Sequence, residues 1–216
     1  MPHAAPERSL AFSGLAVLLT GAVGGALERG WPSAADPAAV ASFIEQHRTA
    51  ILGQSMAFVL SAAIYVWFFA ALRSLLARAE GEGSVLSSLA FGGGLVWAAL
   101  QMVSQALQVG VAMAPTATLQ PATLWMMAAV FSISNLPLAL TLLATALVAF
   151  RTGVLPRWLA WIAVFAAGAQ VALWIGTVVR HGPLAPDGWL TYVLYPSIAL
   201  FLLPTTVLMF RRARAG

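Results

Sequence analysis

A stripe of amide side chains in one apolar segment is the clearest candidate for chemistry in this sequence. Gln101, Gln105 and Gln108 lie inside a long apolar run over residues 86–113. At about 100° per residue they fall within about 60° of one another on a helix, with Trp97 and Ser104 on the same side. In lipid, each amide without a hydrogen-bond partner would cost about 1 to 3 kcal/mol. The stripe is therefore predicted to face other helices or water.

Further amides and tyrosines are predicted to share a cavity with this stripe. With the topology given below, they lie in the outer half or near the middle of the membrane, whereas the inner half holds only serine and threonine. This distribution favours a cavity that opens outward and binds or passes a neutral or amphipathic molecule. The predicted lining is Gln54, Trp97, Gln101, Gln105, Gln108, Asn135, Gln170, Tyr192 and Tyr195.

Helix packing offers an alternative explanation for the same amides. Glutamines in membrane proteins often form interhelical hydrogen bonds, which contribute about 0.6 kcal/mol each and up to about 2 kcal/mol. Asn135 also has a local alternative, because its amide could donate to the carbonyl that Pro137 leaves without a donor. Trp97, Trp125 and Trp174 are candidate aromatic walls, although a position in the headgroup region is the better explanation for Trp125.

Carboxylates at the outer rim are the candidates for acid or base catalysis. Glu28, Asp36 and Glu45 could serve a membrane-embedded enzyme that acts on an isoprenoid or lipid substrate. No Asp, Glu, Arg or His falls in the central part of a predicted span, which argues against proton-coupled or ion-coupled transport. His47 and His181 lie near acidic residues, but no metal-binding motif links them, so no metal is expected.

The composition excludes several classes of site. The chain has no cysteine, which excludes disulfides, thiolate catalysis and iron–sulfur clusters. All 11 basic residues are arginine, so no lysine is present to form a Schiff base. No nucleotide-binding motif occurs, and the arginines form no basic surface suited to nucleic acid. No cofactor is expected, the expected partners are membrane lipids, and formation of a homo-oligomer stays open.

Long apolar segments must position these residues. Hydrophobic residues make up 61% of the 216-residue chain and charged residues only 8%, against about 25% charged in a soluble domain. The sequence therefore predicts an all-α integral membrane protein with six transmembrane helices in a single domain over residues 1–216. Residues 28–48 are predicted to form an outer loop with a short amphipathic helix on the membrane surface. The six predicted spans lie near 10–27, 50–72, 86–113, 122–150, 158–179 and 189–210.

The arginines predict the orientation of these spans. Eight of the 11 arginines fall on the side of a cytoplasmic N-terminus, which satisfies the positive-inside rule. Both termini are therefore predicted to be cytoplasmic, in the plasma (inner) membrane of a bacterium. We expect the first span to be retained as a signal anchor, with a cleaved signal peptide as the alternative. The eight arginines are Arg8, Arg73, Arg78, Arg151, Arg157, Arg211, Arg212 and Arg214.

Prolines and glycines predict the local shape of the helices. Pro137, Pro196 and Pro204 each remove a backbone hydrogen bond inside a span, so the helices are predicted to kink there. Gly21 and Gly25 lie four residues apart in the first span, as do Gly168, Ala172 and Gly176 in the fifth. They are predicted to let a neighbouring helix approach closely.

The loop between the fourth and fifth predicted spans carries the sequence GVLPRWLAW at residues 153–161. This stretch, in a chain of this size and span count, resembles a family of bacterial six-span membrane proteins classed only as a domain of unknown function. The resemblance implies the six-helix fold and no activity. The motif also has a structural explanation, because the glycine can turn the chain, the proline can start a helix and the tryptophans suit the headgroups. Its residues are Gly153, Leu155, Pro156, Arg157, Trp158, Leu159 and Trp161.

Three functional classes remain open at this point. An outward-facing cavity for a neutral or amphipathic, lipid-like molecule accounts best for the distribution of the amides. A membrane-embedded enzyme is the second class, and its carboxylates lie at the rim of the bundle. A scaffold or interaction subunit without a ligand is the third, in which glycines and glutamines serve packing alone.

Overall fold

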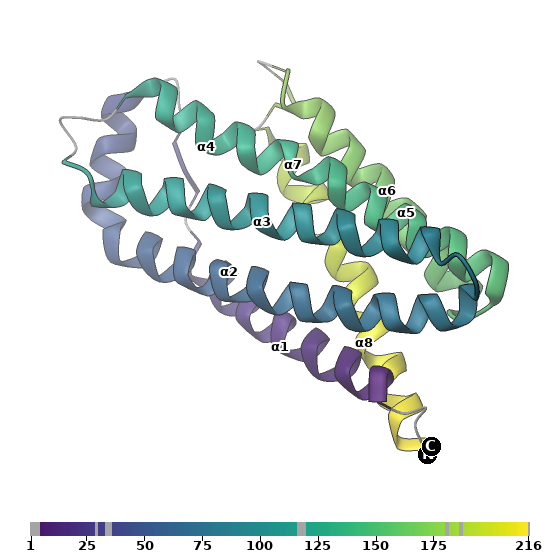
Figure 1. The fold of residues 1–216 in the computed structure, drawn as a ribbon. Coiled ribbons are helices and arrows are strands. Elements are labelled where there is room, and N and C mark those ends of the chain that lie inside the picture. The colour runs from purple at the N-terminus through teal and green to yellow at the C-terminus, as the bar shows by residue number, and fades with distance from the viewer. Residues whose placement is uncertain are drawn as a thin grey trace.

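The chain is all-helical in the computed structural model, which describes residues 5–28, 30–32, 36–115, 120–179, 182–185 and 188–215 (Figure 1). In that part of the chain no strand occurs, so the all-α prediction is confirmed. Six segments are long and apolar enough to cross a membrane, which supports a multi-pass integral membrane protein. The helices are α1 (Ala5–Leu27), α2 (Pro37–Glu80), α3 (Val85–Met113), α4 (Pro121–Ile133), α5 (Asn135–Thr152), α6 (Arg157–Gly176), α7 (Trp189–Leu194) and α8 (Ser197–Ala215).

Local sequence signals set the ends of the longest helix, α2. Asp36 caps its first turn, because its carboxylate accepts a hydrogen bond from the backbone amide of Ala39 at 3.0 Å. The helix ends at Gly81, where φ is 81°, a left-handed value that glycine adopts without strain. The Glu80 carboxylate then accepts hydrogen bonds from two backbone amides at the start of α3, both at 2.9 Å. These bonds fix the tight turn between α2 and α3.

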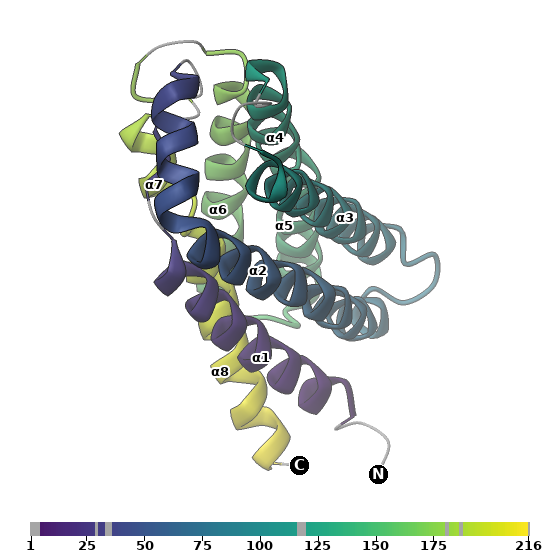
Figure 2. The ribbon, with the colours of Figure 1, turned by 90° about the vertical axis from the view of Figure 1, so that its left-hand side faces the viewer.

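The helices pack in chain order and close into a ring. α1 packs against α2, α2 against α3, α3 against α4 and α5, α5 against α6, and α6 against α7 and α8. α8 then returns to pack against α1 (Figure 2). Each span therefore has one face toward the interior of the ring and another toward the surroundings.

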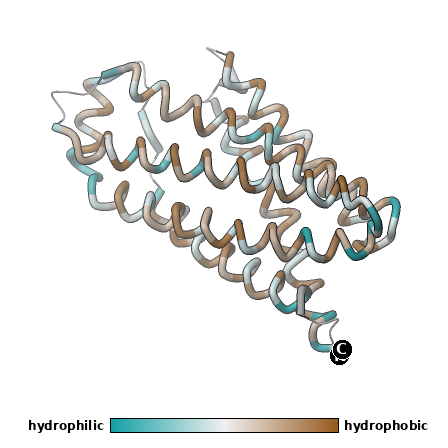
Figure 3. Tube along the Cα trace, in the orientation of Figure 1, coloured by the Kyte–Doolittle hydropathy of each residue, from teal (hydrophilic) through white to brown (hydrophobic). Residues whose placement is uncertain are grey.

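Both ends of the chain lie at the same end of the bundle (Figure 2). Because successive spans alternate in direction, the α2–α3 and α5–α6 turns lie at this end as well (Figure 1). The eight arginines predicted to be cytoplasmic belong to these turns and helix ends, and Figure 3 shows hydrophilic residues there. We call this the arginine-rich end; its cytoplasmic location stays a prediction.

The second span is part of a much longer helix than predicted. The amphipathic helix expected within residues 28–48 forms, but it continues into the span, so α2 has 44 residues. Such a helix is about 66 Å long, against about 30 Å for the hydrocarbon core. Its first turns bury Val40, Ile44 and Ile51 against Val111 of α3 and Leu124 of α4. The apolar face expected on a membrane surface is thus covered by other helices.

Two of the three predicted kinks, those at Pro137 and Pro196, coincide with an interrupted helix, which supports them; no interruption occurs at Pro204. The fourth span breaks at Ser134, three residues before Pro137, and this break separates α4 from α5. The sixth span breaks at Tyr195 and Pro196, which separate α7 from α8. Pro204, in contrast, lies inside α8 without interrupting it. A proline provides no backbone donor for the preceding turn, so each break lies where the ladder of hydrogen bonds is weakest.

The close contacts at glycines do not follow the predicted seams. On α6 a Cβ at Gly168 would meet no atom within 4 Å, whereas one at Gly176 would collide with the backbone of Leu184, which follows α6 and belongs to no neighbouring helix. A Cβ at Gly93 would lie 2.6 Å from a threonine hydroxyl and 2.7 Å from the carbonyl oxygen of Pro137, so α3 and α5 meet at a distance that only glycine permits. A Cβ at Gly25 would meet no atom within 4 Å, and one at Gly21 would meet only a serine oxygen of α2, at 3.9 Å. The prediction of a packing seam at Gly21 and Gly25 is therefore wrong. The two glycines border a cavity instead.

Candidate functional site

Two adjoining cavities lie inside the ring of helices. The first chamber has a volume of about 430 Å³ and the second chamber about 320 Å³, and each value falls in the range of small-molecule sites. Four residues border both chambers: Glu28, Phe58, Tyr195 and Pro196. These four residues therefore mark the junction between the chambers.

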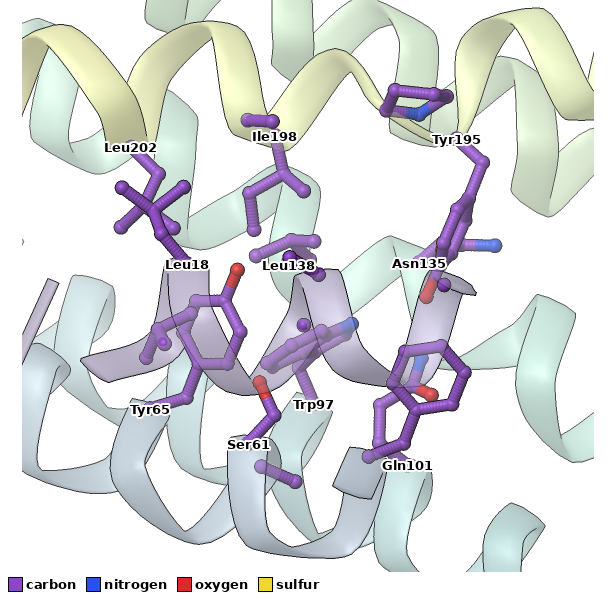
Figure 4. Close-up of a pocket in the computed structure, with 18 of the residues that line it drawn as sticks. Leu18, Ser61, Tyr65, Trp97, Gln101, Asn135, Leu138, Tyr195, Ile198 and Leu202 are labelled. Atoms are coloured by element: carbon purple, nitrogen blue, oxygen red, sulfur yellow. The ribbon is translucent and has the colours of Figure 1, made fainter. Parts of the chain in front are cut away.

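The first chamber is apolar and has aromatic rings on one side. Ile198 and Leu202 of α8 reach in from one side, and Tyr65 of α2 and Trp97 of α3 lie on the other (Figure 4). The rings of Tyr65 and Trp97 meet edge to face with their centroids 4.7 Å apart, which is a favourable aromatic geometry. The Tyr65 hydroxyl points into the chamber (Figure 4).

The second chamber is more polar than the first. Gln54 of α2 and Gln105 and Gln108 of α3 border it, together with Ser132 of α4 and Thr191 of α7. Its aromatic side includes Phe131 and Tyr195. Their rings are tilted by 36° to each other, with centroids 5.1 Å apart. An apolar space thus adjoins a space rich in amides and hydroxyls.

Three glutamines bordering the chambers also connect neighbouring segments. In each case the side-chain nitrogen of the glutamine donates a hydrogen bond to a buried serine hydroxyl. The pairs are Gln101 with Ser134 at 3.0 Å, Gln108 with Ser55 at 2.9 Å, and Gln170 with Ser197 at 3.0 Å. These are the bonds that the packing alternative predicts, so packing accounts for part of the amide stripe.

Two other amides are buried with an unused acceptor. Gln105 Oε1 and Asn135 Oδ1 have no hydrogen-bond partner in the described part of the chain, although the residues are only 6% and 1% exposed. Leaving a buried acceptor unsatisfied costs about 1 to 3 kcal/mol. Gln105 borders the second chamber and Asn135 the first. Each chamber is therefore bordered by a residue whose amide oxygen has no hydrogen-bond partner among the described residues.

The three candidate catalytic carboxylates occupy different environments. Glu28 directly follows α1 and borders both chambers. The residue as a whole is exposed, but partial burial of its carboxyl group raises its pKa above the ordinary value. Asp36 caps α2, and Glu45 lies exposed on α2. Neither of these two residues borders a chamber, so Glu28 is the one candidate carboxylate that lies beside the chambers.

All the residues predicted to line a cavity border one of the two chambers. The first chamber includes Trp97, Gln101, Asn135 and Gln170, the second includes Gln54, Gln105, Gln108 and Tyr192, and Tyr195 borders both. Trp125 and Trp174 do not; they are 47% and 38% exposed. Trp174 therefore forms no wall of either chamber, and the exposure of Trp125 agrees with its alternative position in the headgroup region.

α2 forms a wall of both chambers that was not predicted from the sequence, apart from Gln54. Gln54, Phe58, Ser61 and Tyr65 all border a chamber, and their spacing of four, three and four residues places them on one face of a helix. This periodicity was present in the sequence, but only Gln54 is strongly polar. Phe58 and Tyr65 could not be distinguished from ordinary core residues on composition alone.

The described residues contain no group of three His, Cys, Asp or Glu side chains that could hold a metal ion. His181 and Asp187 lie outside the described residues.

The turn that carries the predicted family motif has the structure that its residues suggest. Gly153 ends α5 with a φ of 69°, and α6 begins directly after Pro156. Comparisons with known protein families, with curated proteins and with solved structures give no match for this chain. The resemblance to a bacterial six-span family therefore stays a prediction.

Proposed function

We propose that this chain is a plasma-membrane protein whose chambers bind, or pass, a neutral or amphipathic, lipid-like molecule. One observation carries the proposal: Gln105 Oε1 and Asn135 Oδ1 are buried acceptors without a partner among the described residues, and both residues border a chamber. Helix packing alone gives no reason for either acceptor. A ligand with O–H or N–H groups would satisfy both.

The walls of the chambers indicate the polarity of this molecule. The first chamber suits a hydrocarbon chain, and the second suits a head that forms hydrogen bonds with amides and hydroxyls. No described arginine borders either chamber, so a phosphate group would find no cationic partner among the described residues. These features favour a neutral head, such as glycerol, over a phospholipid head.

The junction between the chambers lies toward the end of the bundle opposite the arginine-rich end, because it includes Glu28 at the end of α1. With the predicted orientation, the chambers open toward the outer side. This direction depends on the arginine distribution.

Binding of 1-monooleoylglycerol to the protein in lipid nanodiscs tests the proposal. Gln105→Leu should weaken binding by about 1 to 3 kcal/mol, which corresponds to roughly 5-fold to 150-fold. The matched control is Gln46→Leu, because Gln46 is an exposed glutamine of α2 that borders neither chamber. If the wild-type protein does not bind the probe, or if Gln105→Leu binds it as well as the control does, the proposal is wrong.

An enzyme acting on an isoprenoid or lipid substrate is the second candidate, and the position of Glu28 favours it. A carboxylate with a raised pKa at the junction of an apolar and a polar chamber is suited to act as a general acid or base. Incubation with membrane lipids and mass spectrometry of the products tests this role. If the protein is such an enzyme, Glu28→Gln should abolish product formation while monooleoylglycerol still binds. If the wild-type protein forms no product, it is not an enzyme for the lipids tested.

A further inference from the structure

α1 and α8, which close the ring, pack tightly toward the arginine-rich end. A Cβ at Gly14 would collide with the Thr206 side chain, and the rings of Phe12 and Phe210 meet edge to face at 5.7 Å. Met209 is fully buried in this region. The two helices therefore leave no space between them over this part of their length.

The same two helices separate toward their other ends, where the first chamber lies between them. Gly21 and Gly25 of α1 border the chamber, and so do Ile198 and Ala199 of α8. No atom of α8 lies within 4 Å of a Cβ built at either glycine. Figure 4 shows Ile198 and Leu202 extending from α8 into the space beside α1.

The first chamber reaches the surface of the bundle through this gap. Ala22, Gly25 and Ala199 border the chamber and are also exposed. We call the gap the portal and define it by Gly21, Ala22 and Gly25 of α1 and Ile198 and Ala199 of α8. Four of these five residues are glycine or alanine, and their small side chains leave the gap unobstructed.

The surface around the portal is apolar. Leu19 and Val23 of α1 are 60% and 56% exposed, and Leu200 and Leu203 of α8 are 55% and 54% exposed. Both helices belong to segments able to cross a membrane, so these side chains would face hydrocarbon rather than water. A molecule that reaches the portal therefore comes from the bilayer.

We propose that the hydrocarbon chain of a neutral membrane lipid enters the first chamber sideways, between α1 and α8. The chain lies against Leu138 and Trp97, and its polar end passes Asn135, which lies beside the junction residue Tyr195 (Figure 4) and whose unpartnered Oδ1 accepts a hydrogen bond from it. The exposed leucines and valine beside the portal give the same chain a continuous apolar path from the bilayer. This inference rests on the proposed function and adds the route and the part of the ligand that passes first.

Photolabelling tests the route. The protein is placed in phosphatidylcholine vesicles with a monoacylglycerol that carries a diazirine at the end of its chain, and it is irradiated after brief incubation. Mass spectrometry then measures labelling at Leu138 and Trp97, which are only 2% and 6% exposed. Because these residues border the first chamber, a chain that only touches the outer surface does not label them.

Closing the portal should abolish this labelling. Gly25→Leu places a side chain in open space, and the matched control is Gly168→Leu on α6, which is exposed, meets no atom within 4 Å and borders neither chamber. Gly25→Cys, alkylated with a bulky maleimide after folding, closes the portal without depending on how Gly25→Leu folds. Its control is alkylated Gly168→Cys.

Each result is decisive. Loss of labelling at Leu138 and Trp97 with either closed portal, and retention in the controls, supports lateral access. Undiminished labelling with a closed portal overturns the route and leaves the proposed function intact. Absence of labelling in the wild-type protein overturns both.

Discussion

Replacing Gln105 and Gln108 separately by leucine should change the stability of the protein in opposite directions. Both residues lie on one face of α3, border the second chamber and are 6% exposed. They differ in hydrogen bonding, because Gln108 donates to the hydroxyl of Ser55 at 2.9 Å, whereas Gln105 Oε1 has no partner among the described residues. Leucine and glutamine are similar in size, so neither substitution should open a large cavity.

The expected magnitudes follow from this difference. Gln105→Leu removes a buried unsatisfied acceptor, so the free energy of unfolding should rise by up to about 1 to 3 kcal/mol. Gln108→Leu removes an interhelical bond of about 0.6 to 2 kcal/mol and leaves Ser55, which is 0% exposed, without this donor. Its free energy of unfolding should fall by about 1 to 2 kcal/mol. The two variants should therefore differ by about 2 kcal/mol or more.

Thermal and denaturant unfolding of both variants in the same detergent, without added lipid, measures this difference. Wild-type protein provides the reference, and Gln46→Leu provides the surface control. If Gln105→Leu and Gln108→Leu lose stability to the same extent, Gln105 also connects helices. The reasoning from its unused oxygen would then be refuted, and a scaffold without a ligand would become the better interpretation.

Three further predictions concern topology, packing and pH. Ala38→Cys, next to the start of α2, should react with an impermeant maleimide from outside the cell and Glu82→Cys, at the arginine-rich end, should not; the reverse pattern would invert the predicted orientation. Gly93→Ala should lower the free energy of unfolding by about 1 to 3 kcal/mol, because its Cβ would lie 2.7 Å from a backbone carbonyl oxygen of α5. Gly92→Ala, which meets no atom within 4 Å, should not destabilise, and equal losses would contradict this account of the α3–α5 contact. Burial raises the pKa of the Glu28 carboxyl group above its ordinary value of 4.5, so the folded protein binds the carboxyl proton more tightly than the unfolded chain does. The free energy of unfolding should therefore fall as the pH rises above 4.5. Glu28→Gln should remove this part of the pH dependence, and an unchanged profile would show that Glu28 does not cause it.

The amide stripe illustrates what sequence periodicity can predict. Helical spacing alone indicated that Trp97, Gln101 and Gln105 share a face, and the structure buries this face while Val96 and Val103 are 51% and 48% exposed. A polar residue in an apolar helix is easy to recognise, because burying it without a partner is costly. The inward face of α3 was therefore predictable.

The partner of each glutamine was not predictable in the same way. Gln108 bonds to Ser55 and Gln170 to Ser197, and these pairs depend on how whole helices are rotated and shifted against each other. The chain has many serines with the same chemistry, so composition does not select among them. The proposed function depends on the amides that have no hydrogen-bond partner. These can be recognised only after the partners of the other amides are known.

The length of α2 escaped prediction for a different reason. Polar residues such as Gln46, His47 and Arg48 resemble the end of a membrane span, but no proline or glycine breaks the helix at that point. Hydropathy marks where a helix leaves lipid, whereas backbone signals mark where it stops. In α2 these two boundaries lie far apart.

The two interrupted spans give the chambers different mechanical properties. The second chamber is bordered by α4 and α7, which join α5 and α8 only through the breaks at Ser134 and at Tyr195 and Pro196. A segment attached at such a break can bend more readily than an uninterrupted helix, because the proline leaves one bond of the backbone ladder unmade at the joint. The side of the first chamber that α2 and α3 form belongs to uninterrupted rods. A head group of varying size would therefore be accommodated by movement of the two short segments, while the space for the hydrocarbon chain keeps its dimensions.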